Sequence, residues 1–244
     1  MSDTTLNERQ LRWQEKPVLR KIYKDLYARL TAACNPGATL EIGGGSGDIK
    51  GVFNNVVTTD ILPVPWVDLL ADAQALPFAN ESFDNIVMFD VLHHIENPGL
   101  FFKEAQNVLT PGGRIVMVEP YMSPVSEFFY SNFHHEPVLM HDDPWQQKKN
   151  PAKQNKDPFD SNSAIPTLIF HKNPEIFIAK FPTLHIKKVQ PLSLFVYPLS
   201  GGYQSWSLIP NFATSTLLKL ENFLLPFLGR FMAFRSLIVL EKEL

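Results

Sequence analysis

The sequence lacks several features that would point to well-known classes of protein. Its 244 residues include one cysteine, Cys34, which excludes an internal disulfide and a cysteine-ligated metal site. No run of about 18 residues is apolar without charges, so no transmembrane helix is expected. The net charge of −3 lacks the basic excess that a nucleic-acid partner requires. The polar first ten residues contain no secretory-signal core, so we expect a cytoplasmic location.

Short apolar runs alternate with amphipathic segments over the first half of the chain. Strands are expected at 38–42, 55–60, 83–91 and 113–120, because each is a compact apolar run. Residues 16–33 predict a helix with Pro17 at its first position, and 97–113 contain a helical pattern that ends in Pro-Gly-Gly. Strands that alternate with helices predict an α/β fold, doubly wound around a mostly parallel sheet with helices on both faces.

The residues after Glu119 differ from the first half of the chain in composition and in hydrophobic pattern. Residues 121–165 are rich in proline, asparagine, aspartate, lysine and aromatics without a clear period, which predicts a lid-like insertion after the fifth strand. A helix is expected near 174–181, strand material over 185–199, and a final strand over 236–242. The apolar stretch 212–234 has three interpretations, in this order of preference: a core or dimer helix, the wall of an acceptor pocket, or a helix on a membrane surface.

The glycine-rich stretch "LEIGGGSGD", residues 40–48, lies at the first strand-to-helix turn. Ligands of open α/β sheets bind at the carboxyl ends of strands, and glycine allows the backbone to approach them closely. The spacing does not fit a phosphate loop. The dinucleotide fingerprint would place Asp48 where a carboxylate repels a pyrophosphate. The pattern that fits is acidic-x-G-x-G-x-G, formed by Glu41, Gly43, Gly45 and Gly47.

Four blocks within residues 39–120 together resemble the class I S-adenosylmethionine-dependent methyltransferases. They are "LEIGGGSGD", "VVTTDI", "ADAQALPFANESFDNIVMFDVLHHIENP" and "LTPGGRIVMVEP". The resemblance is greatest to the small-molecule enzymes that include the ubiquinone and menaquinone methyltransferases. It implies a Rossmann-like seven-stranded sheet, S-adenosyl-L-methionine as cofactor, and methyl transfer to a small-molecule acceptor. A non-catalytic module that keeps the cofactor pocket is the alternative.

The resemblance also implies a role for each motif residue. Glu41 attracts the ammonium group of the cofactor, the backbone of Gly43, Gly45 and Gly47 passes beside its methionine and ribose portions, and Asp60 accepts the ribose hydroxyls. The adenine is held by Asp72 and the Ala73 N–H, and the backbone of Phe89 and Asp90 closes the methionine side. Asp72 could instead cap a helix, and His93 and His94 are expected to be structural.

This sequence departs from the family pattern in one segment. Pro63 and Pro65 stand between Asp60 and Asp72, and proline blocks helix interiors. The helix that usually follows the second strand is therefore expected to be missing or reduced to a loop, and the helix after the glycines to be short. On this basis a single domain, 1–244, comprises a helical cover (1–35), a cofactor-binding half (36–120), the insertion (121–165) and the C-terminal half of the sheet (166–244).

Candidates for a general base lie in the insertion, where "YSNFHHEPV" contains His134 and His135. The alternative is a surface loop. No metal site is expected from this run, because adjacent side chains rarely converge on one ion. Most aromatic residues follow Glu119, which favours an apolar, lipid-linked or sugar-linked acceptor. Membrane-surface contact and oligomeric state stay open.

Overall fold

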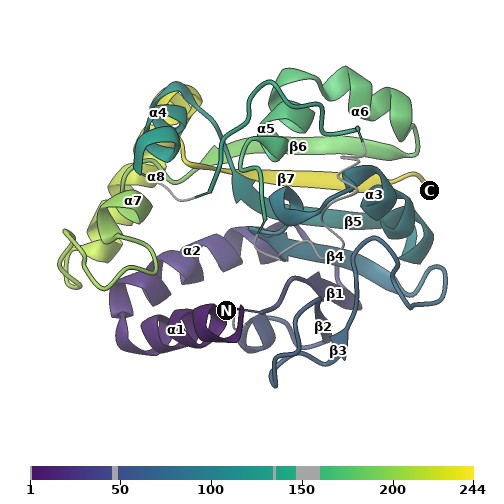
Figure 1. Cartoon of the computed structure of the whole chain (residues 1–244), viewed down its shortest axis with the longest axis horizontal. Helices are drawn as coiled ribbons and strands as arrows, with labels where there is room; N and C mark the ends of the chain where they lie inside the picture. The colour runs from purple at the N-terminus through teal and green to yellow at the C-terminus, as the bar shows by residue number, and fades with distance from the viewer. Residues whose placement is uncertain (1, 46–48, 134–135, 147–159) are drawn as a thin grey trace.

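The computed structural model describes residues 2–45, 49–133, 136–146 and 160–244. Seven strands form one sheet in the order β3-β2-β1-β4-β5-β7-β6 (Figure 1). The strands predicted from the apolar runs are present, and their bounds are β1 (Thr39–Ile42), β2 (Val56–Asp60), β4 (Phe83–Phe89), β5 (Leu109–Pro120), β6 (Leu184–Leu192) and β7 (Arg235–Lys242). The short β3 (Leu69–Leu70) completes the sheet at one edge.

The sheet is mixed, with one strand running against the others. β1 to β5 pair in parallel with their neighbours, whereas β7 is antiparallel to both β5 and β6. Because β7 runs backwards, its first residue, Arg235, pairs with Pro120 at the end of β5. The start of β7 therefore lies at the same edge as the carboxyl ends of the parallel strands. The strand order reverses between β1 and β4, and ligands of such sheets bind at this point.

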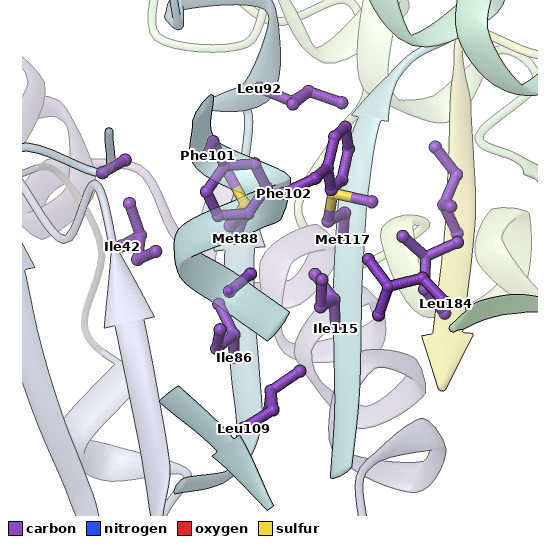
Figure 2. Close-up of a cluster of buried hydrophobic side chains, with 14 of the residues drawn as sticks. Ile42, Ile86, Met88, Leu92, Phe101, Phe102, Leu109, Ile115, Met117 and Leu184 are labelled. Atoms are coloured by element: carbon purple, nitrogen blue, oxygen red, sulfur yellow. The ribbon is translucent and has the colours of Figure 1, made fainter. Parts of the chain in front are cut away.

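One face of the sheet is covered by α3 (Pro98–Val108), the short helix α5 (Ile165–Thr167), the π-helical turn η3 (Leu168–Lys172) and α6 (Pro174–Lys180). Phe101 and Phe102 of α3 are fully buried beside Met88 of β4 and Met117 of β5 (Figure 2). Each such side chain contributes about 1.5–3 kcal/mol through burial. Asn97 caps α3 by accepting the Leu100 N–H, so the predicted helix begins where the sequence places it.

The opposite face is covered by α2 (Pro17–Ala33), α7 (Val196–Ser200) and α8 (Thr214–Met232). The residues of α2 that repeat at intervals of four are buried with the β4 and β5 valines, as their spacing predicts; they include Val18, Ile22, Leu26 and Leu30. A further helix, α1 (Ser2–Glu15), precedes α2 and lies alongside it (Figure 1). Lys16, between the two helices, places its ammonium group within hydrogen-bond distance of the carbonyls of Ser200, Gly202, Gln204 and Trp206, so its three N–H donors hold the N-terminal helices and the segment after α7 together.

The expected loss of helices around β2 is confirmed for the described residues. Between β1 and β2 they contain only the single turn η1 (Ile49–Gly51), and between β2 and β4 they contain no helix. Two other expectations need correction. The strand predicted over 185–199 ends at Leu192, because Ser193 adopts a positive φ of 57° that interrupts an extended chain, and α7 follows. Region 121–165, where no period is evident, contains the helix α4 (Pro124–Phe133).

Helix α8 occupies most of the apolar stretch 212–234 and packs beside α4 (Figure 1). Leu225 and Gly229 are buried, whereas Phe223, Phe227 and Phe231 are exposed. The interpretation as a core helix therefore accounts for one side of α8 only. Across the described residues, every helix falls short of the length and apolar character that crossing a membrane requires.

Candidate active site

The glycine loop leaves β1 at the carboxyl edge of the sheet. The N–H groups of Gly43 and Gly44 both donate to the Thr59 carbonyl of β2, each at 2.9 Å. Gly43 has a φ of +76°, and a Cβ atom there would lie 2.3 Å from the Val91 side chain. Glycine is required at this position by both conformation and space. The described part of the loop is thus held between β2 and the segment that follows β4.

Asp60, the last residue of β2, holds the loop from the side. Its Oδ2 accepts the Gly45 N–H at 2.8 Å, and its Oδ1 accepts the Leu62 N–H at 2.8 Å. Burial raises the pKa of Asp60, while these backbone donors oppose the rise. Trp66 donates its indole N–H to the Gly45 carbonyl at 3.2 Å. The carboxylate is therefore fixed beside the glycine loop.

Glu41 lies beneath the same loop and is 4% exposed. A Cβ atom at Gly44 would lie 2.5 Å from its Oε2, so the Glu41 carboxylate occupies the space that a side chain at residue 44 would need. Thr59 donates its hydroxyl to the Glu41 carbonyl at 2.8 Å. Of the predicted residues, Glu41, Gly43, Gly45 and Asp60 are thus brought together, while Gly47 lies outside the described residues.

Asp72 and Ala73 follow β3, the strand that lies on the far side of β2 from the glycine loop. The Asp72 Oδ1 accepts the Gln74 N–H at 2.9 Å and the Gln74 amide at 3.2 Å, which fixes a turn. No helix begins here in the described chain, so the alternative of a helix N-cap is wrong. Ala73 is buried. The two residues share the carboxyl edge with Asp60.

Phe89 ends β4, on the other side of β1 from β2, and Asp90 follows it. Asp90 has a φ of +57°, and its N–H donates to the Val118 carbonyl at 2.9 Å. Its carboxylate pairs with the guanidinium of Arg235 at the start of β7. The Arg235 side chain is 2% exposed. Burial alone would lower the pKa of Arg235, but Asp90 and nearby tyrosines raise it well above its usual value. Arg235 is therefore a buried positive charge at the site.

Three tyrosines surround this pair and are called the tyrosine cluster below: Tyr23 of α2, Tyr197 of α7 and Tyr203 of the loop after it. The Tyr23 ring stacks on Phe89 with centroids 4.9 Å apart, and the Arg235 guanidinium lies 4.4 Å from the centroid of Tyr197. Sequence reasoning did not assign these residues to the site. They come from distant segments, and only the strand order and the reversed direction of β7 reveal that its start lies at the same edge of the sheet as the end of β4, with β5 between them.

His93 lies in the turn η2 (Leu92–His94) just after β4. Its Nδ1 bonds to Glu119 Oε2 at 2.8 Å, and its Nε2 lies 3.4 Å from Glu136 Oε2. Burial would lower the pKa of His93, but the hydrogen bonds to Glu119 and Glu136 outweigh it and raise the pKa to about 10. The predicted base candidates His134 and His135 lie outside the described residues, so their role stays a prediction.

Comparison with known sequences agrees with this geometry. Residues 40–117 match the family described as "Methyltransferase domain". An uncharacterized protein of Methanocaldococcus jannaschii is 32% identical over 108 residues, which cover 39% of this chain and 51% of that protein. The ubiquinone/menaquinone biosynthesis C-methyltransferase UbiE of Hahella chejuensis is 32% identical over 105 residues, which cover 34% of this chain and 42% of that protein. The chain thus spans about half the length, or less, of these relatives.

Solved structures share the fold over nearly the whole chain. A SAM-dependent methyltransferase of Thermotoga maritima has a TM-score of 0.55 at 15% identity and covers 98% of this chain and 99% of its own. A SAM-dependent methyltransferase of Archaeoglobus fulgidus has a TM-score of 0.53 at 14% identity and covers 91% of this chain and 94% of its own. Fold and matched domain together support a class I S-adenosylmethionine-dependent methyltransferase. The matched family and the fold imply S-adenosylmethionine as the cofactor.

Proposed function

We propose that the chain transfers the methyl group of S-adenosylmethionine to a small acceptor at the carboxyl edge of β1 and β4. The observation that carries the proposal is the Asp60 carboxylate, fixed beside a glycine loop at the point where the strand order reverses. When bound, the cofactor supplies an electrophilic methyl group on a sulfonium centre. The protein then has to position the acceptor and exclude water.

The donor set fits this cofactor residue by residue. An ionised carboxylate offers about four lone-pair positions, and the Gly45 and Leu62 N–H groups use two of those on Asp60. The remaining positions suit the two ribose hydroxyls. Glu41, under the loop, is assigned to the ammonium group. Asp72 and the Ala73 N–H are assigned to the adenine, and the backbone of Gly43, Gly45 and Gly47 to the space beside the methionine and ribose.

The acceptor is assigned to the tyrosine cluster and Asp90. Phe89 and the tyrosine rings supply apolar faces, and the charged pair of Asp90 and Arg235 lies among them. This combination favours an acceptor with an apolar or ring-bearing body and an oxygen for polar contact; lipid-linked and sugar-linked acceptors both fit. The UbiE relatives, which are named as C-methyltransferases of quinone biosynthesis, support an acceptor of this kind.

The decisive experiment follows the methyl group. The protein is incubated with methyl-labelled cofactor and with lipid and aqueous cell extracts, and each fraction is assayed for label. Calorimetry with the cofactor and its demethylated product is run in parallel. Label in the lipid fraction supports the apolar acceptor, and label in the aqueous fraction a polar one. Binding without transfer to any fraction would favour the non-catalytic alternative, and no binding at micromolar concentrations would refute the assigned pocket.

A further inference from the structure

Three side chains beside the candidate active site bring metal-ligating atoms close together. They are His93 and His94 of η2 and Glu136 of the segment after α4, and one ligand atom from each lies within 4.8 Å of the other two. His93 Nε2 is 3.4 Å from Glu136 Oε2, and His94 Nε2 is 4.0 Å from Glu136 Oε1. Two atoms bound to one tetrahedral zinc ion at about 2.0–2.1 Å lie about 3.3–3.4 Å apart. The 3.4 Å separation matches this spacing, and the longer ones, up to 4.8 Å, would have to shorten when one shared ion binds.

Glu119 sets the orientation of the His93 ring. It is fully buried, and its Oε1 accepts the N–H groups of Val91 and Leu92, each at 2.8 Å. Its Oε2 lies 2.8 Å from His93 Nδ1. With the Nδ1–H donated to this carboxylate, Nε2 is the ring atom that faces Glu136, and an ion between them would take the place of the proton that Nε2 donates in the imidazolium form. A carboxylate that orients a ligating histidine in this way is a usual companion of protein-bound metals.

Glu136 has an outer partner of its own. Ser163 donates its hydroxyl to Glu136 Oε2 at 3.0 Å, so the carboxylate is held against the two imidazoles. The side chains of His94 and Glu136 are 19% and 12% exposed, and that of His93 is 2% exposed. His93 and Glu136 are thus oriented by second partners, and all three side chains are largely shielded from solvent.

The charges at this position require compensation. Glu119 and Glu136 are two carboxylates that flank a buried imidazole, and burying carboxylates without a positive partner is costly. Either a proton on His93 or a bound cation can supply positive charge. A divalent ion offsets both carboxylates, whereas one proton offsets only one. The convergence of the three ligand atoms favours the ion.

We propose that His93, His94 and Glu136 bind one divalent transition-metal ion of the zinc type, with a fourth position open. Two histidines and one glutamate with an open position are a ligand set of catalytic zinc sites. The adjacency argument against a metal at residues 134–136 also concerns the neighbours His93 and His94, but the turn η2 brings their rings to 4.2 Å between centroids, and the third ligand, Glu136, comes from a different segment. The sequence expectation of no metal is thereby replaced by this proposal.

The location suggests a use for the ion. Val91, just before η2, fills the space above Gly43 of the glycine loop, so the metal ligands begin two residues from a cofactor-loop contact. A hydroxyl bound to the open position would lose its proton more easily. This use in acceptor activation rests on the proposed methyl transfer, whereas the metal site itself does not.

The test uses the full chain, treated with a chelator and then freed of it, without any cofactor. Zn²⁺ is titrated by calorimetry, and Co²⁺ by the visible absorption that tetrahedral and five-coordinate sites produce. We expect saturable binding of one ion per chain. His94→Ala and Glu136→Gln remove ligands and should weaken binding by more than Glu119→Gln, which removes a positioning residue and should cost about 10- to 100-fold.

His185→Ala is the matched control, because His185 is exposed on β6 far along the chain from η2. It should leave the affinity unchanged, and far-UV circular dichroism should show that all variants are folded. Absence of saturable binding of either ion, or binding that His94→Ala does not weaken, would overturn the proposal and leave a proton on His93 as the compensating charge. Because no cofactor is present, a failure of the methyl-transfer proposal would not alter these results.

Discussion

At the scale of single residues, the candidate site depends on side chains that perform a structural and a binding task together. Asp60 accepts two backbone N–H groups, so its carboxylate is already oriented before any ligand arrives. Gly43 is confined by its positive φ and by Val91. Such preorganisation lowers the entropy that a ligand has to overcome when it binds.

Replacing Asp60 by alanine should weaken binding of S-adenosylmethionine and of its demethylated product by about 10- to 100-fold, since hydrogen bonds to a charged group contribute about 1.5–3 kcal/mol each. Calorimetry measures the change. Asp68→Ala is the control, because Asp68 lies nearby but pairs with Lys50 and the Thr58 N–H rather than with the glycine loop. Equal affinity of the Asp60→Ala and native proteins would remove the ribose assignment.

His171 should make the stability depend on pH below neutrality. Its ring stacks on Tyr121 with centroids 4.1 Å apart, and burial lowers its pKa to about 4. Between pH 6.5 and 4 the unfolded chain binds a proton at this residue that the folded chain does not, so the free energy of unfolding falls as the pH falls. The loss should reach up to about 3 kcal/mol.

Urea unfolding at several pH values, compared between the native chain and His171→Phe, isolates this effect. Phenylalanine keeps the stacking and cannot be protonated, so the free energy of unfolding of His171→Phe relative to that of the native chain should rise by up to about 3 kcal/mol as the pH falls from 6.5 to 4. His185→Gln, at an exposed residue, should follow the native profile. Parallel profiles for the native chain and His171→Phe would contradict the assignment.

At the scale of elements, α8 combines a buried side with exposed aromatic residues. Glu221 is 3% exposed and accepts the N–H groups of Phe195 and Val196, which ties α8 to the start of α7. Phe223 and Phe227 lie on the solvent side with ring centroids 6.2 Å apart. The helix is thus anchored by a polar contact as well as by apolar packing.

Pro226 lies inside α8 and is exposed. It cannot donate the hydrogen bond that a helix interior supplies, and proline costs a helix about 3 kcal/mol relative to alanine. Pro226→Ala should therefore raise the free energy of unfolding by about 1–3 kcal/mol, measured with urea. Phe223→Ala, on the exposed side, should change it by less than about 0.5 kcal/mol. A loss of stability in Pro226→Ala would show that the packing of α8 depends on a bend at this residue.

At the scale of the whole molecule, the antiparallel β7 joins the two halves of the chain. It pairs with β5 over seven residues from Arg114 to Pro120 and with β6 on its other side. Arg235, at its start, pairs with Asp90 of the first half and is buried among aromatic rings. The first and last segments of the sheet should therefore unfold together.

Arg235→Met should destabilise the whole chain by about 3 kcal/mol, because it leaves Asp90 without its partner in a largely buried position. Arg114→Met is the control, since Arg114 of β5 pairs with Glu241 at the other end of β7, and this more exposed pair should contribute about 1 kcal/mol or less. Urea unfolding followed by tryptophan fluorescence and by circular dichroism should give coincident transitions. Separate transitions would contradict a single cooperative unit.

Local patterns account for what could be predicted of the fold. The run Ile86–Val87–Met88–Phe89 predicted a strand buried on both faces, and the four-residue repeat of α2 predicted the side that it buries. Pro63 and Pro65 predicted the missing helix. The motif acids and glycines were found because their roles depend on spacing along one short segment.

The sequence by itself determined β1, β2, β4, β5 and β7, the helices α2 and α3, and the glycine loop with Glu41 and Asp60, because each depends on neighbours within a few residues. Only the tertiary structure decided that Arg235 meets Asp90, that the tyrosine cluster surrounds them, and that Glu136 meets His93 and His94. These contacts join residues separated by long stretches of chain, and their partners are set by strand order and by the reversed direction of β7. Local sequence patterns do not identify such partners, because the residues become neighbours only when the sheet is assembled.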